Sequence, residues 1–191
     1  AFGNITFVDS AAIDLDSSAS ANGDLFINAG TDGAISGDLS ITATTGNITQ
    51  NIALTIGGTS SFTTSASNAT ITLSTDSNAL TGAVSAVTAG TSGDVTIDNG
   101  TTALNLGTVT ANGDLSIRGG NGITDSGVIT VSGTSLFHSD ITGKVITLDS
   151  VNAMTGAVSI THTGSANVAI DNGTTALNLG TISVGKDFSA T

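Results

Sequence analysis

The decapeptide DNGTTALNLG occurs twice in this chain, at residues 98–107 and again at 171–180. Three other segments recur with it at nearly the same offset: 79–85 at 153–159, 58–62 at 133–137 and 36–41 at 112–117. Such self-similarity is typical of stacked arrays, in which each unit buries its apolar face on its neighbours. We therefore expect residues 1–191 to form one repeat segment. Its super-repeat of about 73–76 residues covers approximately 36–111 and 112–185, after a partial repeat at 1–35.

The composition argues for strands and against helices. All 15 acidic residues are Asp, and the only basic residues are Arg118, Lys144 and Lys186, so the long straight side chains that favour helices are nearly absent. Thr, Ser, Val, Ile, Asn and 25 Gly take their place, and these residues favour strands and turns. A disordered chain is the alternative, but a hydrophobic fraction of 38% argues against it.

Short stretches alternate apolar and polar residues with period two, for example at 115–117, 128–131 and 145–148, and each is followed by turn residues. This pattern predicts short strands with one buried face. A sandwich or barrel is the alternative, but it would not repeat in sequence. We expect a parallel β-helix (β-solenoid) of about ten coils of 18–20 residues, since four coils would fill one super-repeat, as 112–131, 132–150, 151–170 and 171–185. The same surface would then return about every 19 Å along the axis. The absence of Pro fits, because each coil needs its backbone N–H groups for pairing.

Residues 113–117, 122–127, 128–134 and 177–181 resemble the β-strand repeats of giant bacterial surface and secreted proteins. These repeats are similar to filamentous-haemagglutinin-like exoproteins of two-partner secretion, and the resemblance covers nearly the whole chain. It implies a right-handed parallel β-helix, an extracellular location at the bacterial cell surface, export through an outer-membrane route, and a role as adhesin shaft or fibre. The secretion domain of that family is not found in these 191 residues.

Charge and composition narrow the partners. The formal net charge of −12 argues against nucleic acid and anionic membranes, both of which attract Lys and Arg. No apolar run approaches the roughly 20 residues of a membrane span. There is no Cys, so thiol chemistry is excluded. We expect self-association or continuation into a longer repeat chain, and contact with host or neighbouring-cell surface glycans.

The sequence offers no convincing catalytic or cofactor-binding residue. Arg118 is interpreted as a solvated turn residue, since the nearest other basic residue, Lys144, lies more than one expected coil away. His138 and His162 are also interpreted as solvent-facing, because they form neither a catalytic Ser-His-Asp order nor a metal-spaced pair. The glycine-rich turn 119–122 lacks the helix that a phosphate cradle requires.

Asp residues recur in turns, at Asp24, Asp38, Asp114 and Asp187 and before Asn-Gly at Asp98 and Asp171. The structural interpretation is that their side chains bond the local backbone and that Asn-Gly accepts positive φ. Calcium is the alternative, chiefly as a bridge between chains, although the nonapeptide of calcium-binding β-rolls is missing. Thr-x-Thr motifs at 42–44, 70–72, 108–110 and 161–163 are too scattered for an ice-binding face.

These observations predict a non-catalytic structural segment of an extracellular bacterial fibre or adhesin shaft that continues or polymerises end to end. The alternatives are a glycan- or cell-surface-binding adhesin module acting through loops such as 86–93, a polysaccharide-active enzyme and an ice-binding protein. No catalytic, cofactor or metal residue is predicted. The predicted interior includes Leu104, Leu177 and three phenylalanines, Phe62, Phe137 and Phe188.

Overall fold

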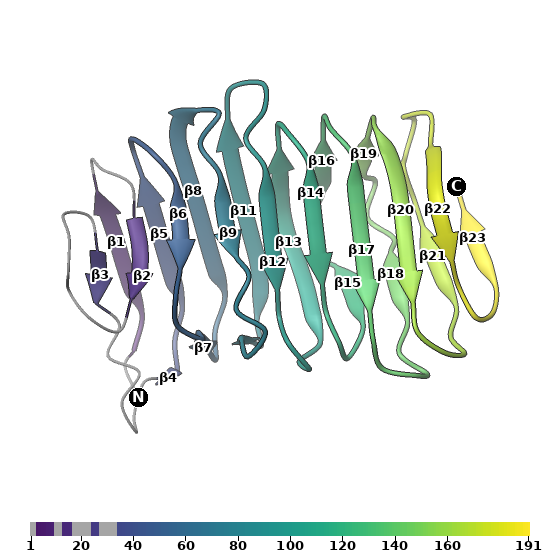
Figure 1. The fold of residues 1–191 in the computed structure, drawn as a ribbon, viewed down its shortest axis with the longest axis horizontal. Helices are drawn as coiled ribbons and strands as arrows, with labels where there is room; N and C mark the ends of the chain where they lie inside the picture. The colour runs from purple at the N-terminus through teal and green to yellow at the C-terminus, as the bar shows by residue number, and fades with distance from the viewer. Residues whose placement is uncertain (1–2, 10–12, 17–23, 27–33) are drawn as a thin grey trace.

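The described part of the chain is an all-β solenoid of about seven turns. A computed structural model describes residues 3–9, 13–16, 24–26 and 34–191, and these contain strands but no helix. The strand pairs are parallel from the first coil to the last. In Figure 1 the nearer strands run downward and the farther strands upward while the chain advances from left to right, so the winding is right-handed. The predicted fold class is therefore confirmed.

One broad wall of the rod is an 11-stranded sheet. Its strands are β1 (Ile5–Asp9), β5 (Leu39–Ala43), β8 (Ser60–Ser67), β11 (Ala83–Ala89), β13 (Leu104–Ala111), β15 (Ile123–Asp125), β16 (Ile129–Val131), β18 (Ile146–Leu148), β19 (Ala153–Met154), β21 (Val168–Ile170) and β23 (Phe188–Ala190).

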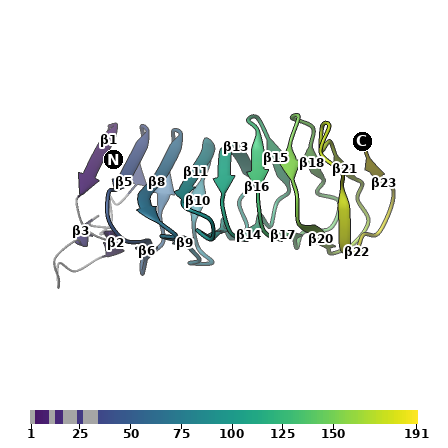
Figure 2. The same cartoon turned by 90° about the horizontal axis from the view of Figure 1, so that it is seen from above.

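The opposite wall is a 9-stranded sheet. Its strands are β2 (Ile13–Asp16), β3 (Asp24–Phe26), β6 (Ile48–Gln50), β9 (Ile71–Leu73), β12 (Val95–Asp98), β14 (Leu115–Arg118), β17 (Ser135–Ser139), β20 (Ala157–His162) and β22 (Asn178–Ser183). Figure 2 shows the coils stacked in one row between the two ends of the rod.

A third, short sheet follows one edge of the rod over the first coils. It contains β4 (Ala34–Ile35), β7 (Thr55–Ile56) and β10 (Ala79–Leu80), which lie along the lower edge in Figure 1. No strand of this sheet follows β10 along that edge in the described coils.

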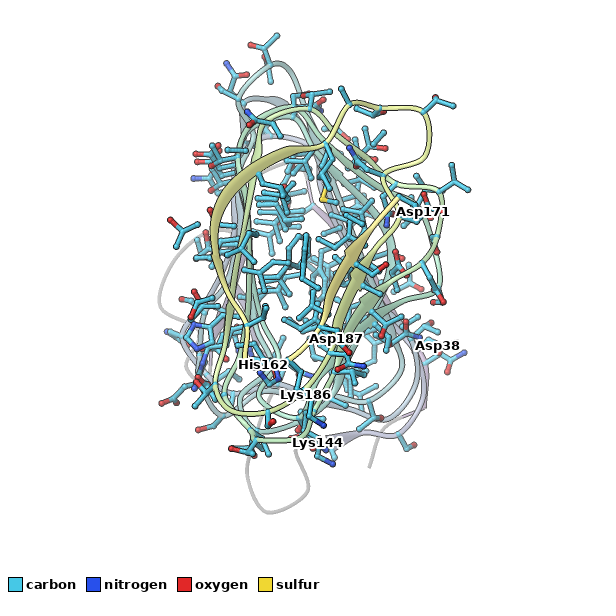
Figure 3. All side chains as sticks on the ribbon, turned by 90° about the vertical axis from the view of Figure 1, so that its right-hand side faces the viewer. Asp38, Lys144, His162, Asp171, Lys186 and Asp187 are labelled. Carbon is cyan, nitrogen blue, oxygen red and sulfur yellow. The ribbon has the colours of Figure 1, made fainter. Side chains whose placement is uncertain are left out.

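The core lies between the two walls, where alternate side chains of each strand point inward. β5 and β20 show this alternation over their whole lengths, and the interior seen along the axis in Figure 3 is filled with side chains. Phe62, Phe137 and Leu104 are fully buried, as predicted. Leu177 and Phe188 are only partly buried, because no further coil stacks on the last described one.

The coils are longer than predicted. On the 9-stranded sheet Ile48 pairs with Ile71, Ile71 with Val95, and Val95 with Leu115, so each of these coils takes about 20–24 residues. The predicted number of coils, about ten with 18–20 residues in each, is therefore too high, and about seven coils are present.

The super-repeat spans three and a half coils and not the predicted four. The segment 37–41 contains β5 of the 11-stranded sheet, whereas its copy at 113–117 contains β14 of the 9-stranded sheet. Between them the chain crosses alternately from wall to wall through β6, β8, β9, β11, β12 and β13. Each segment of the second copy consequently lies on the wall opposite its counterpart.

The short strands at the edges of the rod also change sides from one super-repeat to the next. The sequence counterparts of β7 and β10, one super-repeat further along the chain, are β16 and β19. In Figure 1 the first two strands lie at the lower edge and the last two at the upper edge. Successive super-repeats are thus related by a half-turn about the axis.

Buried asparagines fasten one coil to the next at these edges. Asn99 accepts a hydrogen bond from the Leu80 N–H (2.8 Å) and donates to the carbonyls of Leu80 (3.1 Å) and Ala103 (2.9 Å). Asn172 makes the equivalent bonds to the N–H and carbonyl of Met154 and the carbonyl of Thr175. Both side chains are buried. Their amide groups make the hydrogen bonds to the backbone of Leu80 and Met154 that a neighbouring strand would otherwise make.

Candidate functional site

Three of the charged side chains that the sequence offered as candidates meet at one place, on the outer face of the 9-stranded sheet. Asp98, Arg118 and His138 occupy matched positions on β12, β14 and β17. Arg118 bonds Asp98 (2.8 Å) on one side and Asp140 (2.6 Å) on the other, and His138 reaches Asp140 (2.5 Å). Arg118 therefore lies at the end of a strand within an ion-pair network, and its interpretation as a solvated turn residue is wrong.

The network tunes its members for stability. Hydrogen bonds from Arg118 to Asp98 and then to Asp140 raise the pKa of Arg118. Burial alone would raise the pKa of Asp140, but hydrogen bonds from Arg118 and His138 outweigh it and lower that pKa below its ordinary value. Asp140 is therefore charged at neutral pH and satisfied by its partners. The side chains of this cluster thus serve one another as ion-pair and hydrogen-bond partners.

The cluster could have been found in the sequence. Asp98, Arg118 and His138 are evenly spaced along the chain, and each interval is one coil in this part of the rod. The signal in the sequence is therefore the regular Asp-Arg-His spacing, which the spacing of the basic residues alone does not show.

His162 differs from its predicted solvent-facing position. It lies on β20 with 4% of its surface exposed, and its Nε2 contacts the carbonyl oxygen of Lys144. Its Nδ1 is buried without a hydrogen-bond partner among the described residues. His162 thus holds the turn 140–145 against the end of β20.

The turn Asp residues bond backbone groups in two ways, and only the first is the local bond that the sequence predicted. Asp98 and Asp171 accept the N–H of Gly100 (2.8 Å) and Gly173 (2.7 Å), and both glycines have positive φ, which confirms the local turn. Asp38 and Asp114 instead accept the N–H of Thr59 and Thr134 on the next coil (2.7 Å each). The turn before Asp24 lies outside the described residues.

Other sequence candidates are dispersed over the rod. Residues 86–89 of the proposed loop 86–93 belong to strand β11, and only the turn after it projects, above the neighbouring turns in Figure 1. The Thr-x-Thr motifs lie on both walls, at β5 and β13 on one and at β9 and β20 on the other. They do not form one flat face.

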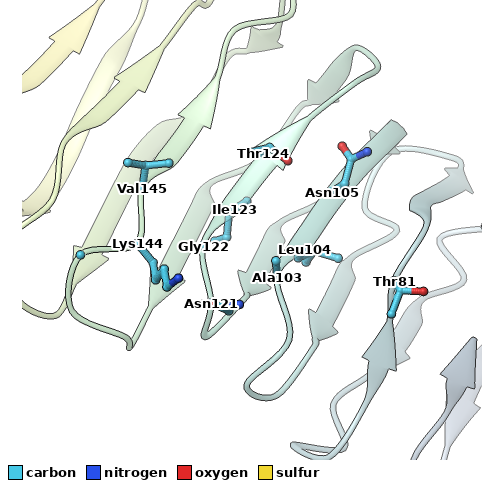
Figure 4. A pocket seen from close by; sticks show the side chains of 11 residues that line it. Thr81, Ala103, Leu104, Asn105, Asn121, Gly122, Ile123, Thr124, Lys144 and Val145 are labelled. Atoms are coloured by element: carbon cyan, nitrogen blue, oxygen red, sulfur yellow. The ribbon is translucent and has the colours of Figure 1, made fainter. Parts of the chain in front are cut away.

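A groove of about 250 Å³ lies at the lower edge of the rod, beyond β10, the last strand of the short sheet. It runs along the beginnings of strands β13 and β15 of the 11-stranded sheet. Its exposed apolar lining comes from Ala103 and Val145, because Leu104 and Ile123 are buried in the core, and its rims are polar (Figure 4). The polar lining comes from four coils: Thr81, Asn105, Asn121, Thr124 and Lys144. Sequence reasoning missed this groove because it depends on the half-turn between super-repeats, which leaves the lower edge without a strand after β10.

Metal and membrane features are not found in the described part of the chain. Residues 3–9, 13–16, 24–26 and 34–191 contain no cluster of three or more metal-ligating His or Asp side chains. The same residues contain no helix long and apolar enough to cross a bilayer.

Comparison with known proteins places these features in a repeat family. A family model described as "Repeats of unknown function (DUF5649)" matches residues 2–87 and 92–161. No curated protein and no solved structure matches the chain.

Proposed function

This chain belongs to the family of repeats of unknown function DUF5649, and we propose that it serves as a non-catalytic structural segment, one length of a rod. The observation that carries the proposal is the unbroken pairing of each coil with the next along both walls. Such an array gains stability and length together, because every added coil buries the face of the previous one.

The chemistry of the outer surface supports this role. The cluster around Arg118 stabilises three neighbouring coils, and the turn aspartates bond backbone groups. The proposed setting is an extracellular fibre or adhesin shaft at a bacterial surface. It is supported by the resemblance of the repeats to those of giant surface proteins and by a charge of −12, which keeps neighbouring rods apart.

The last described coil supports end-to-end continuation. One edge of β22 and one edge of β23 have no strand beside them, and Leu179 of β22 is 47% exposed. An unpaired parallel edge with apolar side chains is a template for another strand. We propose that a further coil, from the same chain or from a second copy, stacks on this end.

Sedimentation velocity and electron microscopy of the 191-residue chain at rising concentration test the stacking. We expect linear oligomers that Leu179→Lys removes, because a charge at that end must be buried to stack. Val151→Lys is the matched control, since Val151 is 65% exposed on the side of the rod. A monodisperse monomer at high concentration, or equal loss in both variants, contradicts stacking between copies.

The non-catalytic part of the proposal has its own test. The chain is incubated with a panel of acidic and neutral polysaccharides, and reducing ends and unsaturated products are measured. We expect no turnover above the blank. Cleavage that disappears in the Arg118→Ala variant would replace the structural role with an enzymatic one.

A further inference from the structure

The groove beside the short sheet differs in charge from the rest of the chain. The protein carries 15 Asp, yet none of the residues that line the groove is acidic. Lys144 is the one charged lining residue. The groove is therefore positively charged and lined with hydrogen-bonding groups, although the chain as a whole is negative.

The backbone of Lys144 is anchored, whereas its ammonium group has no ion-pair partner among the described residues. Its carbonyl oxygen is bound by the buried His162, which fixes the turn on which it lies. Within the described residues no carboxylate lies at ion-pair distance from Lys144, whereas Arg118 has two. Figure 4 shows the Lys144 side chain extending toward the neighbouring coil at Asn121 and Gly122.

The opposite rim carries neutral polar groups beside exposed apolar side chains. Asn105 and Thr124 lie side by side on neighbouring strands, since Asn105 pairs with Thr124 in the register of β13 and β15. The Asn105 side-chain oxygen is buried and has no hydrogen-bond partner among the described residues. The exposed side chains of Ala103 and Val145 supply the apolar surface of the groove, whereas Leu104 and Ile123 are core residues.

We propose that this groove binds a single sugar unit that carries a carboxylate. Its volume of about 250 Å³ lies below the roughly 300–1,000 Å³ typical of drug-sized sites, which suits a monosaccharide. The C–H face of a sugar ring packs on the exposed Ala103 and Val145, its hydroxyls bond the polar groups of the rims, and its carboxylate pairs with Lys144. The inference is independent of the proposed structural role, because a passive rod can also carry a binding site.

The experiment is a titration of the isotope-labelled 191-residue chain, followed by the amide NMR signals of residues 121–124 and 143–145. The probes are glucuronic acid, glucose as its neutral match, and acetate as the carboxylate alone. We expect glucuronic acid to shift these signals with millimolar affinity. Glucose and acetate should bind about tenfold more weakly or worse, as the loss of a charge-assisted hydrogen bond predicts.

Two variants give the proposal its controls. Lys144→Gln should weaken glucuronic acid binding about tenfold or more, while Lys186→Gln, which changes a lysine outside the groove, should leave it unchanged. Signals from β5 and β8 report whether each variant keeps its fold, and Asn121→Ala replaces Lys144→Gln if that variant does not. The proposal is overturned if glucuronic acid shifts nothing, if acetate binds equally well, or if Lys144→Gln binds as the parent does. Equal binding of glucose overturns the role of the carboxylate.

Discussion

At the scale of single residues, the exact recurrence of residues 98–107 has a structural explanation. Asp98 closes a turn on Gly100, Asn99 bonds the coil below, and Leu104 and Leu106 enter the core. The second copy repeats the turn at Asp171 and Gly173 and the bonds at Asn172. Several side chains of this segment are thus fixed by the turn, by the contact between coils and by the core.

Replacing Asn99 by Ala should be strongly destabilising. It leaves the N–H and carbonyl of the fully buried Leu80 without these partners, and each unsatisfied buried group costs about 1–3 kcal/mol. Chemical denaturation measures the change in the free energy of unfolding. Thr101→Ala, an exposed change in the same segment, is the control and should remain within about 0.5 kcal/mol.

Asp140 makes the stability of the rod sensitive to acid. Its pKa is lowered in the folded chain, so its ion pairs stabilise the fold above the ordinary value of 3.8, and this contribution is lost as the pH falls through the lower folded value. We expect Asp140→Asn to lower the melting temperature at pH 7, with the difference from the parent shrinking below pH 3.8. A difference that is constant from pH 7 to the acid limit would remove Asp140 from this role.

At the scale of strands and turns, close backbone contact between coils limits what the edges accept. A Cβ atom on Gly82 would lie 2.2 Å from the carbonyl oxygen of Gly58, and one on Gly156 would lie 2.1 Å from that of Gly133. Gly58 and Gly133, and likewise Gly82 and Gly156, are counterparts in the two super-repeats. The recurrent glycines mark the edge where one coil lies directly on the next.

Gly82→Ala should therefore cost about 1–3 kcal/mol, because the backbone of Gly58 must move to admit the methyl group. Gly143→Asn is the matched substitution at a turn with positive φ and open space, and its counterpart in the first super-repeat, Asn68, has a φ of 62°. Thermal unfolding of both variants measures the contrast. Equal losses would mean that crowding at the edge does not decide which residue is accepted.

The sequence predicted the elements better than their assembly. Alternation and turn residues identified short parallel strands, the buried Phe62, Phe137 and Leu104, and the turns at Asp98 and Asp171. It did not predict the coil length, because both walls bury alternate residues and a segment reads the same on either wall. The super-repeat shows the same alternation of apolar and polar residues whether it forms three and a half coils or four. For the same reason the groove and the burial of His162 were not foreseen.

At the scale of the whole molecule, stability is distributed along the axis. Each inner coil is paired on both sides, whereas β22 and β23 are paired on one side only in the described coils. Arrays whose units contact only their neighbours open from the ends.

Amide hydrogen exchange should therefore be slowest in the central coils, at β11–β14, and fastest at β22 and β23. The measurement is exchange followed by mass spectrometry or NMR on the 191-residue chain. Protection that is uniform from β5 to β23 would show that the rod opens as one cooperative unit instead.

The half-turn between super-repeats determines how a long chain of them meets its surroundings. After three and a half coils, or about 17 Å, an equivalent surface faces the other way. A binding feature encoded once per super-repeat is therefore offered alternately to the two sides. A partner bound at such a feature would be held on both sides of the rod, whereas a rod of whole-coil repeats would hold it on one side only.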